Sequence, residues 1–310
     1  MKKFRKTLST VILLALVALA VYLFPELKPI LFPDSKPAYI AAPESTGELT
    51  VHYIDVGQAD CTLLECGGQT MLIDGGNVED SSLVVSYLKN QGIEHLDYMI
   101  CTHAHEDHVG GLSGPLNSCT VGQVFSPVAE YDSTAFESFL KYTGAQGLEL
   151  TVPEADDSFL LGEARVTVLG PRKEYEETND TSIVLRVDHG ENSFLFTGDM
   201  EVTAEADLLA DGCDLDVDVL KVGHHGSNTS SSYAFLREVM PEYGVISCGT
   251  DNSYGHPHDE VTSRLYDAEV TVYRTDEQGT VVAVSDGIGI LFTTEKNVPP
   301  TGGREKRAVG

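Results

Sequence analysis

The chain has 310 residues, which is enough for one large domain with a sizeable core. Its 48 Asp and Glu against 20 Lys and Arg give a formal net charge of -28 at pH 7. A charge of this size repels polyanions at long range and argues against a broad nucleic-acid-binding face, so acidic substrates are expected only where bound cations reverse the local sign.

The first predicted element is an export signal. Four of the first six residues are Lys or Arg, and an uncharged apolar run follows over residues 11–24. This run is as long as a signal-peptide core and shorter than the roughly 20 residues of a membrane span. We therefore assign residues 1–26 to a signal peptide or signal anchor, with cleavage left open, and the proline-containing residues 27–47 to a linker. The folded body is expected outside the cytoplasm, secreted or held at the membrane by this segment.

The body is predicted to begin as an antiparallel sheet. Residues 49–56, 61–66 and 70–74 read as strands between glycine-containing turns, followed by a helix over 81–90 and a buried strand over 97–101. Further strands are expected over 164–169, 182–188, 193–196, 218–222, 244–247, 270–273, 281–284 and 288–292, and helices over 134–142, 201–210, 230–239 and 259–266.

Strands interspersed with helices predict an α+β fold. The natural packing is a four-layer αββα sandwich over residues 48–295, followed by a disordered tail over 296–310, which is rich in Pro, Gly and charge. The six cysteines lack a CxxC spacing, and most are read as small buried core residues, with any disulfide pairing left open.

Potential metal ligands are concentrated directly after the strand over 97–101. The run from His103 to His108 reads HAHEDH. Imidazole nitrogens and carboxylate oxygens are the ligands that zinc, manganese and iron take in proteins. On a loop, His103 and His105 can face one ion while Asp107 and His108 face a second.

Three other predicted strands also end in potential ligands. Asp74 closes one in LIDGG, Asp199 follows another in FTGD, and His224 and His225 open the segment HHGS after a third. Four strand ends are therefore expected to converge on one rim.

The order Asp74, HxHxDH, TGD and HHGS resembles the signature of the metallo-β-lactamase superfamily. Within residues 48–293, the phrases DVGQAD (55–60), NDTS (179–182) and YGHPH (254–258) are similar to the hydrolase domain of ComEC-type competence proteins. The channel-forming helices of full competence proteins have no counterpart in the sequence, so we expect a stand-alone hydrolase domain rather than a DNA-uptake pore.

The resemblance implies two divalent metal ions, for which zinc is favoured over manganese or iron. It places Asp199 between the ions and one histidine of the 224/225 pair at the second ion. We favour His225 as this ligand and His224 as a substrate contact. Asp74 is interpreted as a residue that orients a ligand through hydrogen bonds.

The sequence departs from the family pattern at one ligand. Classical members have another histidine between HxHxDH and TGD, where this chain has only His189, at a predicted hairpin turn. ComEC-like domains carry the NDTS phrase instead, so we assign Asp180 to the first ion, with Asn179 and His189 as alternatives. The first ion is then less fully ligated.

Asp107, His224 and His256 are the predicted catalytic residues. Asp107 would orient the nucleophile as well as bind metal, while His224 or His256 would stabilise charge on the substrate and help to protonate the leaving oxygen.

The favoured function is an exported phosphodiesterase or nuclease that acts on a nucleic acid or an envelope polymer, with no protein partner inferred. The alternatives are a cell-envelope phosphoesterase resembling the choline-phosphate esterases, a β-lactamase, and a non-catalytic binding protein on the same fold.

Overall fold

The structure is a computed structural model that describes residues 47–303 of the chain. The export segment assigned to residues 1–26 lies outside the described residues, as does the predicted linker apart from Gly47. Within the described part of the chain, no helix is both long and apolar enough to cross a membrane. Export and membrane attachment therefore stay predictions.

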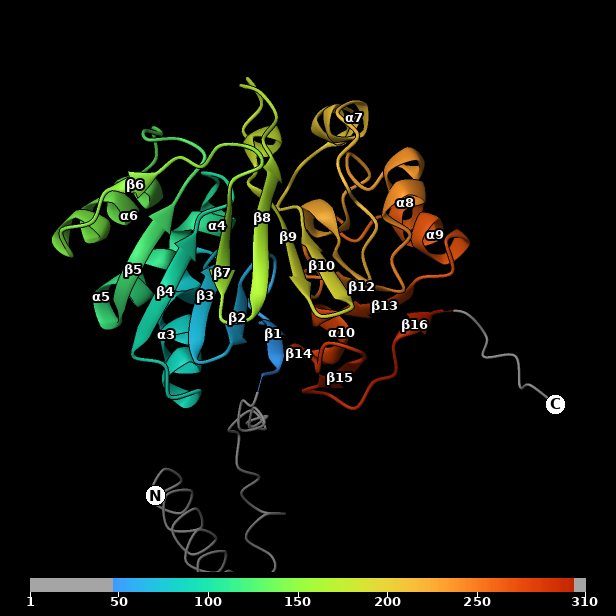
Figure 1. Cartoon of the computed structure of the whole chain (residues 1–310), viewed down its shortest axis with the longest axis horizontal. Helices are drawn as coiled ribbons and strands as arrows, with labels where there is room; N and C mark the ends of the chain where they lie inside the picture. Colours follow the sequence, from blue (N-terminus) through green and yellow to red (C-terminus); the bar gives the residue numbers. More distant parts are fainter. Residues whose placement is uncertain (1–46, 304–310) are drawn as a thin grey trace, which may run out of the picture. The chain divides into compact units, whose positions relative to one another are not determined.

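The first sheet has eight strands and begins with the predicted antiparallel series (Figure 1). In order across the sheet, they are β15 (Ile290–Thr294), β14 (Val281–Ser285), β1 (Leu49–Tyr53), β2 (Thr62–Cys66), β3 (Gln69–Ile73), β4 (His95–Ile100), β5 (Thr120–Phe125) and β6 (Leu150–Thr151). β1 to β3 pair antiparallel, whereas β3 to β6 are parallel. The parallel pairing brings the ends of β3 and β4 to the same edge, where Asp74 N donates to Ile100 O.

The second sheet also has eight strands. In order, they are β16 (Thr301–Gly302), β13 (Thr271–Arg274), β12 (Tyr243–Ile246), β11 (Val219–Lys221), β10 (Asn192–Phe196), β9 (Val184–His189), β8 (Ala164–Gly170) and β7 (Ser158–Leu161). β10 to β13 are parallel, and β9 and β10 form the predicted hairpin. The ends of β10 and β11 therefore deliver Asp199 and His225 to one edge of this sheet.

Helices cover the outer face of each sheet, and the two inner faces pack together (Figure 1). The first sheet carries α3 (Ser81–Asn90), α4 (Glu106–Val109), α5 (Ser113–Ser118) and α6 (Thr134–Ala145); the second carries α7 (Val202–Ala210), α8 (Tyr233–Val239) and α9 (Asp259–Asp267); α10 (Thr275–Gln278) follows β13. Between the sheets, the rings of Tyr53 and Phe196 stack at 6.2 Å. The predicted αββα sandwich is confirmed, and its three apolar layers provide the burial that stabilises it.

Several elements differ from the sequence prediction. β5 was not predicted, because Gly122 and two exposed positions interrupt its apolar pattern. Residues 296–303, assigned to a disordered tail, contain β16, which pairs with β13 through Thr301 and Gly302. The Gln278 side chain also donates to Pro299 O. The predicted disorder is therefore wrong for residues 296–303.

All six cysteines of the chain are free thiols in the structure. Five are buried, and Cys213 is half-buried. This placement agrees with the interpretation of most of them as core residues.

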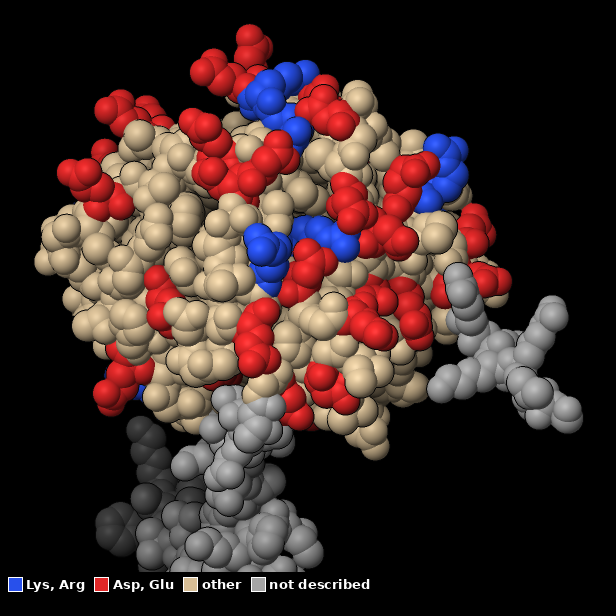
Figure 2. Space-filling view, viewed as in Figure 1, with Lys and Arg blue, Asp and Glu red and all other residues tan. Residues whose placement is uncertain are grey.

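The surface is strongly acidic (Figure 2). Asp and Glu side chains are spread over the face shown there, whereas Lys and Arg form a few isolated groups. Some cations of the described chain are already paired, such as Arg172 with Asp156 and Asp211, and Lys173 with Asp207. Paired cations have little capacity left to attract an anionic polymer.

Candidate metal centre

The histidine run changes from a loop to a helix within six residues. His103 and His105 lie in the loop after β4, whereas α4 begins at Glu106, so Asp107 and His108 lie in its first turn. The prediction of one continuous loop is corrected in this respect. His103 Nε2 lies 3.1 Å from His105 Nδ1, so these two nitrogens form the first pair of potential ligands.

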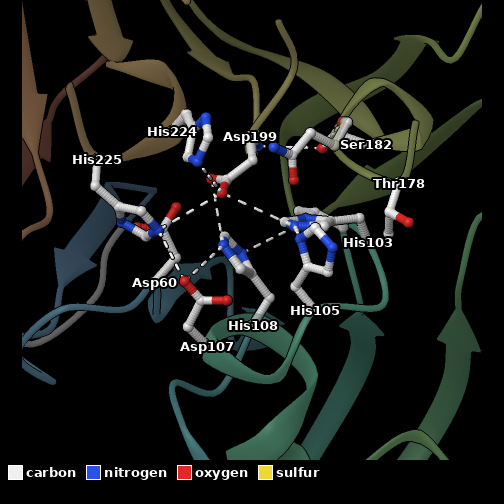
Figure 3. A network of polar contacts seen from close by, with 12 residues as sticks. Asp60, His103, His105, Asp107, His108, Thr178, Ser182, Asp199, His224 and His225 are labelled. Carbon is white, nitrogen blue, oxygen red and sulfur yellow. Dashed lines mark hydrogen bonds and ion pairs between the residues drawn. The ribbon is translucent and has the colours of Figure 1, made fainter. Parts of the chain in front are cut away.

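A second set of potential ligands surrounds Asp107 and His108. Ligand atoms of Asp107, His108, Asp199 and His225 all lie within 4.8 Å of one another. His225 Nε2 is 3.3 Å from Asp107 Oδ2, and His108 Nε2 is 3.2 Å from Asp199 Oδ1. The potential ligands therefore meet at one place, as the sequence analysis expected (Figure 3). They come from the loop after β4, from α4, and from the segments that follow β10 and β11.

The Asp199 carboxylate lies between the two sets of ligands (Figure 3). Its Oδ2 atom is 3.9 Å from His103 Nε2 and 3.6 Å from His225 Nε2. The preceding Gly198 has φ +52°, and a Cβ atom there would meet the Ser182 and Thr102 side chains at 2.9 and 3.1 Å. Glycine is therefore required for the tight turn that aims Asp199 at the centre.

The side chains at this centre fit divalent cations. His108 Nε2, His225 Nε2 and Asp199 Oδ1 are buried and make no hydrogen bond, although the ion-pair contacts given above bring them close to one another and to Asp107. Buried polar atoms without a hydrogen bond are uncommon and are consistent with a site for an ion. Nitrogen and carboxylate donors that point at one another match the ligand set of zinc, manganese or iron. Asp107, His108, Asp199 and His225 could therefore hold one ion, and the predicted assignment of His103 and His105 to another, with Asp199 shared, is compatible with this geometry.

Asp74 orients His108 from behind. Its Oδ2 atom lies 2.8 Å from His108 Nδ1, and it accepts hydrogen bonds from Thr102 N and Thr102 Oγ1 at 2.8 and 2.6 Å. An imidazole that donates from Nδ1 keeps Nε2 available for a metal ion. The structure thus places Asp74 where the sequence analysis expected a ligand-orienting residue.

His225 Nδ1 lies 3.0 Å from Ser247 O and also faces the buried pair of Asp60 and Lys221, and the sequence analysis assigned none of these three residues a role at His225. Asp60 Oδ1 lies 3.2 Å from His225 Nδ1, and Lys221 Nζ lies 2.8 Å from Asp60 Oδ2. Both charged side chains are almost fully buried. Asp60 N also donates to Asp107 O, so Asp60 contacts two ligands of the second ion.

The pKa of His103 is shifted in the opposite direction to those of His108 and His225. Although burial lowers the pKa of His108, the Asp199 and Asp74 carboxylates raise it to well above its usual range. Burial is likewise outweighed at His225, where Asp199 and Asp60 raise the pKa to about 10. Burial and the neighbouring His108 hold the pKa of His103 well below its usual range. Metal and protons therefore compete for the second set of ligands.

His224 and His225 lie on consecutive left-handed residues, with φ 49° and 53°. Such backbone strain in non-glycine residues costs about 1–3 kcal/mol each and occurs preferentially at functional sites. The two residues project differently: His225 is buried, whereas the His224 side chain is 21% exposed. His224 Nε2 lies 3.5 Å from Asp199 Oδ2, and its Nδ1 lies 3.3 Å from Glu201 Oε1.

His256 covers the second-ion side of the centre. Its ring centroid is 6.2 Å from that of His225 and 5.5 Å from that of His224, and Gln58 Nε2 lies 3.2 Å from its Nδ1. Burial and the two neighbouring histidines lower the pKa of His256 to about 4. At neutral pH the imidazole is therefore uncharged.

Asp180, the predicted ligand of the first ion, has another role. Its Oδ1 atom accepts from Glu201 N at the start of α7, and it also accepts from Ala204 N. The structure places the Asp180 carboxylate at the start of this helix and outside the group formed by Asp107, His108, Asp199 and His225, so its assignment to the first ion stays a prediction. Asn179 remains open at the variable position: Nδ2 donates to Glu201 Oε1, whereas Oδ1 is buried without a partner.

His189 lies far from the centre in the β9–β10 hairpin. Its Nδ1 and Nε2 atoms each lie 2.9 Å from a partner, Ser285 Oγ and Gly47 O. These contacts connect the hairpin to β14 and to the start of the described chain. His189 is a structural residue, as its predicted position at a turn indicated.

Two mixed sheets packed between helices, with His and Asp side chains gathered at their strand ends, define a metallo-hydrolase fold with a potential metal-binding site. The chain belongs to the metallo-β-lactamase superfamily, whose family model matches residues 54–250.

Its relatives are competence proteins. It is 30% identical to ComE operon protein 3 of Bacillus subtilis over 76% of this chain and 33% of that protein. It is 32% identical to competence protein ComA of Neisseria gonorrhoeae over 80% of this chain and 33% of that protein, and 31% identical to recombination protein 2 of Haemophilus influenzae over 74% and 28%. The chain therefore spans about a third of the length of the curated relatives it matches.

Solved structures share the fold at lower sequence identity. The metallo-β-lactamase fold protein YhfI of Bacillus subtilis has a TM-score of 0.53 at 15% identity, covering 77% of this chain and 100% of that one. A CmlA β-hydroxylase mutant has a TM-score of 0.52 at 16% identity, covering 77% and 54%. These similarities support the fold alone.

Proposed function

We propose that this chain is an exported, dinuclear-metal phosphodiesterase that acts on a nucleic acid or another phosphodiester. The observation that carries the proposal is the position of Asp199 between the two sets of ligands, within 3.9 Å of His103 Nε2 and 3.2 Å of His108 Nε2. A carboxylate between two sites can bind two ions at once. Two neighbouring ions can stabilise both the attacking and the leaving oxygen when a phosphodiester is hydrolysed. The relationship to competence proteins favours a nucleic-acid phosphodiester over other esters.

When bound, two divalent ions would polarise the phosphodiester and lower the pKa of a shared water molecule. The chain supplies orientation and proton transfer. Asp107, whose side chain is 30% exposed, can accept a hydrogen bond from the attacking water. Glu201 Oε1, 3.3 Å from His224 Nδ1, holds the ring with Nε2 towards Asp199, so we place His224 as the proton donor to the leaving oxygen.

His256 has the complementary role. Because its pKa is lowered to about 4, it is neutral in the working pH range and donates a hydrogen bond rather than a proton. This divides the predicted roles: His224 acts as the general acid, and His256 stabilises charge on the phosphodiester.

The acidic surface limits the substrate. The net charge of -28 repels long duplex DNA, so a short or single-stranded substrate whose phosphate binds at the metal centre is favoured. The same surface favours the second candidate, a cell-envelope phosphoesterase that acts on a small substrate group. A non-catalytic role is disfavoured by the inward-facing ligand group of Asp107, His108, Asp199 and His225.

The experiment compares four substrates with the purified protein: bis-p-nitrophenyl phosphate, single-stranded DNA, a choline-phosphate ester and nitrocefin. We expect hydrolysis of the first two, and loss of it in Asp199→Asn but not in His189→Ala. Preferential hydrolysis of the choline-phosphate ester would favour the envelope enzyme. Nitrocefin hydrolysis alone, or no hydrolysis by a metal-loaded protein, would contradict the proposal.

A further inference from the structure

An exposed tyrosine extends the row of rings at the second-ion side of the centre. Tyr254 is 67% exposed. Its ring centroid lies 5.5 Å from that of His256, and the two ring planes meet at 22°. The His256 ring in turn lies nearly parallel to that of His225, also at 22°. One face of a large aromatic side chain is therefore open to solvent two rings away from a predicted metal ligand.

The loop that presents Tyr254 is held in place by its own hydrogen bonds. Asn252 Oδ1 accepts from His256 N at 3.0 Å, and Asn252 Nδ2 donates to Gly249 O at 2.9 Å. Gln58 Oε1 accepts from Gly249 N at 3.1 Å, which connects the loop to the first sheet. Tyr254 is thus a pre-organised exposed ring, and such a ring costs little entropy when a ligand stacks on it.

A second tyrosine lies at the opposite end of the centre. Tyr131 is half-buried, and its ring lies 6.5 Å from that of His105. Tyr131 also packs edge-on against the buried Phe136 of α6, at 6.1 Å. Each predicted metal site therefore has an aromatic side chain at its outer side.

We infer that Tyr254 and Tyr131 bind the two nucleobases that flank the cleaved phosphodiester, so that the substrate is single-stranded nucleic acid or a dinucleotide with its bases splayed apart. This inference rests on the proposed function. A phosphate at the centre projects one substituent towards each tyrosine, and every base offers a planar face for stacking. Stacking on the bases can supply affinity for the substrate that ion pairing with its phosphates cannot, because the acidic surface has few free cations.

The test is the steady-state hydrolysis of a deoxyadenosine dinucleotide, of the same dinucleotide with either base removed, and of methyl p-nitrophenyl phosphate, which has no base. Tyr254→Ala should raise KM for the intact dinucleotide about 5- to 150-fold, equivalent to about 1–3 kcal/mol of stacking, with kcat changed much less. Tyr254→Phe should restore the parent KM. When the base that stacks on Tyr254 is removed from the dinucleotide, the parent and Tyr254→Ala should have the same KM.

A spectroscopic readout separates stacking from a structural effect. A dinucleotide that contains 2-aminopurine should lose fluorescence when it binds the parent protein or Tyr254→Phe, but not Tyr254→Ala. The chain has no tryptophan, so the probe can be excited without protein background. The matched control is Tyr266→Ala on α9, where the tyrosine is 71% exposed and lines a separate pocket with Arg274 and Thr301. This control should match the parent in every assay.

The outcomes distinguish this inference from the proposed function. Hydrolysis of all four diesters with no effect of Tyr254→Ala on KM or fluorescence would overturn the stacking inference and leave the proposed phosphodiesterase activity intact. If Tyr254→Ala raised KM only for a choline-phosphate ester, the stacking inference would be overturned. The Tyr254 ring would then bind a quaternary ammonium group instead of a base. Failure of a metal-loaded parent protein to hydrolyse any phosphodiester would overturn both.

Discussion

The two halves of the metal centre are built differently. The second-ion half has three protein ligands besides Asp199, and two of them, His108 and His225, are oriented by the buried carboxylates of Asp74 and Asp60. The first-ion half has only His103 and His105, of which His105 is half-buried. Ligand number and support from surrounding residues both set metal affinity. The comparison predicts a firmly held second ion and an exchangeable first ion.

The largest expected effect is that of Asp199→Asn. The substitution keeps the shape of the side chain but removes the negative charge between the ions, and it leaves the first ion with two histidines. We expect the first ion to be lost while the second is retained, and activity to fall by about 10³-fold or more. Metal content per chain and turnover measure this. If the variant lost the second ion and kept the first, the comparison would be reversed.

Lys221→Met tests the framework behind the second ion. It leaves the buried Asp60 carboxylate without its cation, and loss of one partner from a buried ion pair typically costs about 3–5 kcal/mol. Denaturant unfolding should show this loss, and adding Asp60→Asn should recover part of it. The control is Lys173→Met, because Lys173 is a half-exposed partner of Asp207 and should contribute at most about 1 kcal/mol. Equal effects of the two lysine substitutions would refute a special role for Lys221.

The pH dependence of metal binding should also differ between the halves. Because the pKa of His225 is raised to about 10 and that of His108 lies well above its usual range, both carry protons at neutral pH before metal binds. Metal must displace these protons, so affinity for the second ion should rise with pH, about tenfold per unit for each proton displaced. The pKa of His103 is lowered, so that residue should release none. Calorimetry in buffers of different ionisation enthalpy counts the protons, and equal release at both sites would be inconsistent with this assignment.

His189→Ala should have the smallest effect on function. The side chain makes two hydrogen bonds in the hairpin and none at the centre, so two ions and near-parental activity are expected. Stability should fall by about 1–3 kcal/mol, because buried partners lose their hydrogen bonds. A lost ion in this variant would place His189 at the centre after all.

Local motifs predicted the first layer of the centre well. Four ligand groups follow four strands, and the parallel pairing of β3 with β4 and of β10 with β11 brings the ends of each pair together, so the sequence alone places His103, Asp199 and His225 at one rim. The same reasoning missed Lys221, because nothing in VLKV distinguishes a buried lysine from an exposed one. Asp60 was missed for a related reason, since its partners lie about 160 residues away in the chain.

Asp180 shows what local motifs leave undecided. A carboxylate beside the predicted centre can bind a metal ion or cap a helix, and the sequence does not reveal which backbone N–H groups will face it. In the fold, α7 begins beside Asp180, and the free N–H group of Glu201 donates a hydrogen bond to the carboxylate.

The strand β16 was not predicted from the sequence. It has only two residues, and these pair with β13, a partner that the local sequence does not specify.

The most direct test of the account is a titration of the metal-free protein with zinc or manganese while hydrolysis of bis-p-nitrophenyl phosphate is followed. We predict two ions per chain, little activity after the first equivalent fills the Asp107–His108–His225 half, and a steep rise as the second equivalent fills the His103–His105 half. Full activity with one equivalent, or none with two, would contradict a dinuclear phosphodiesterase.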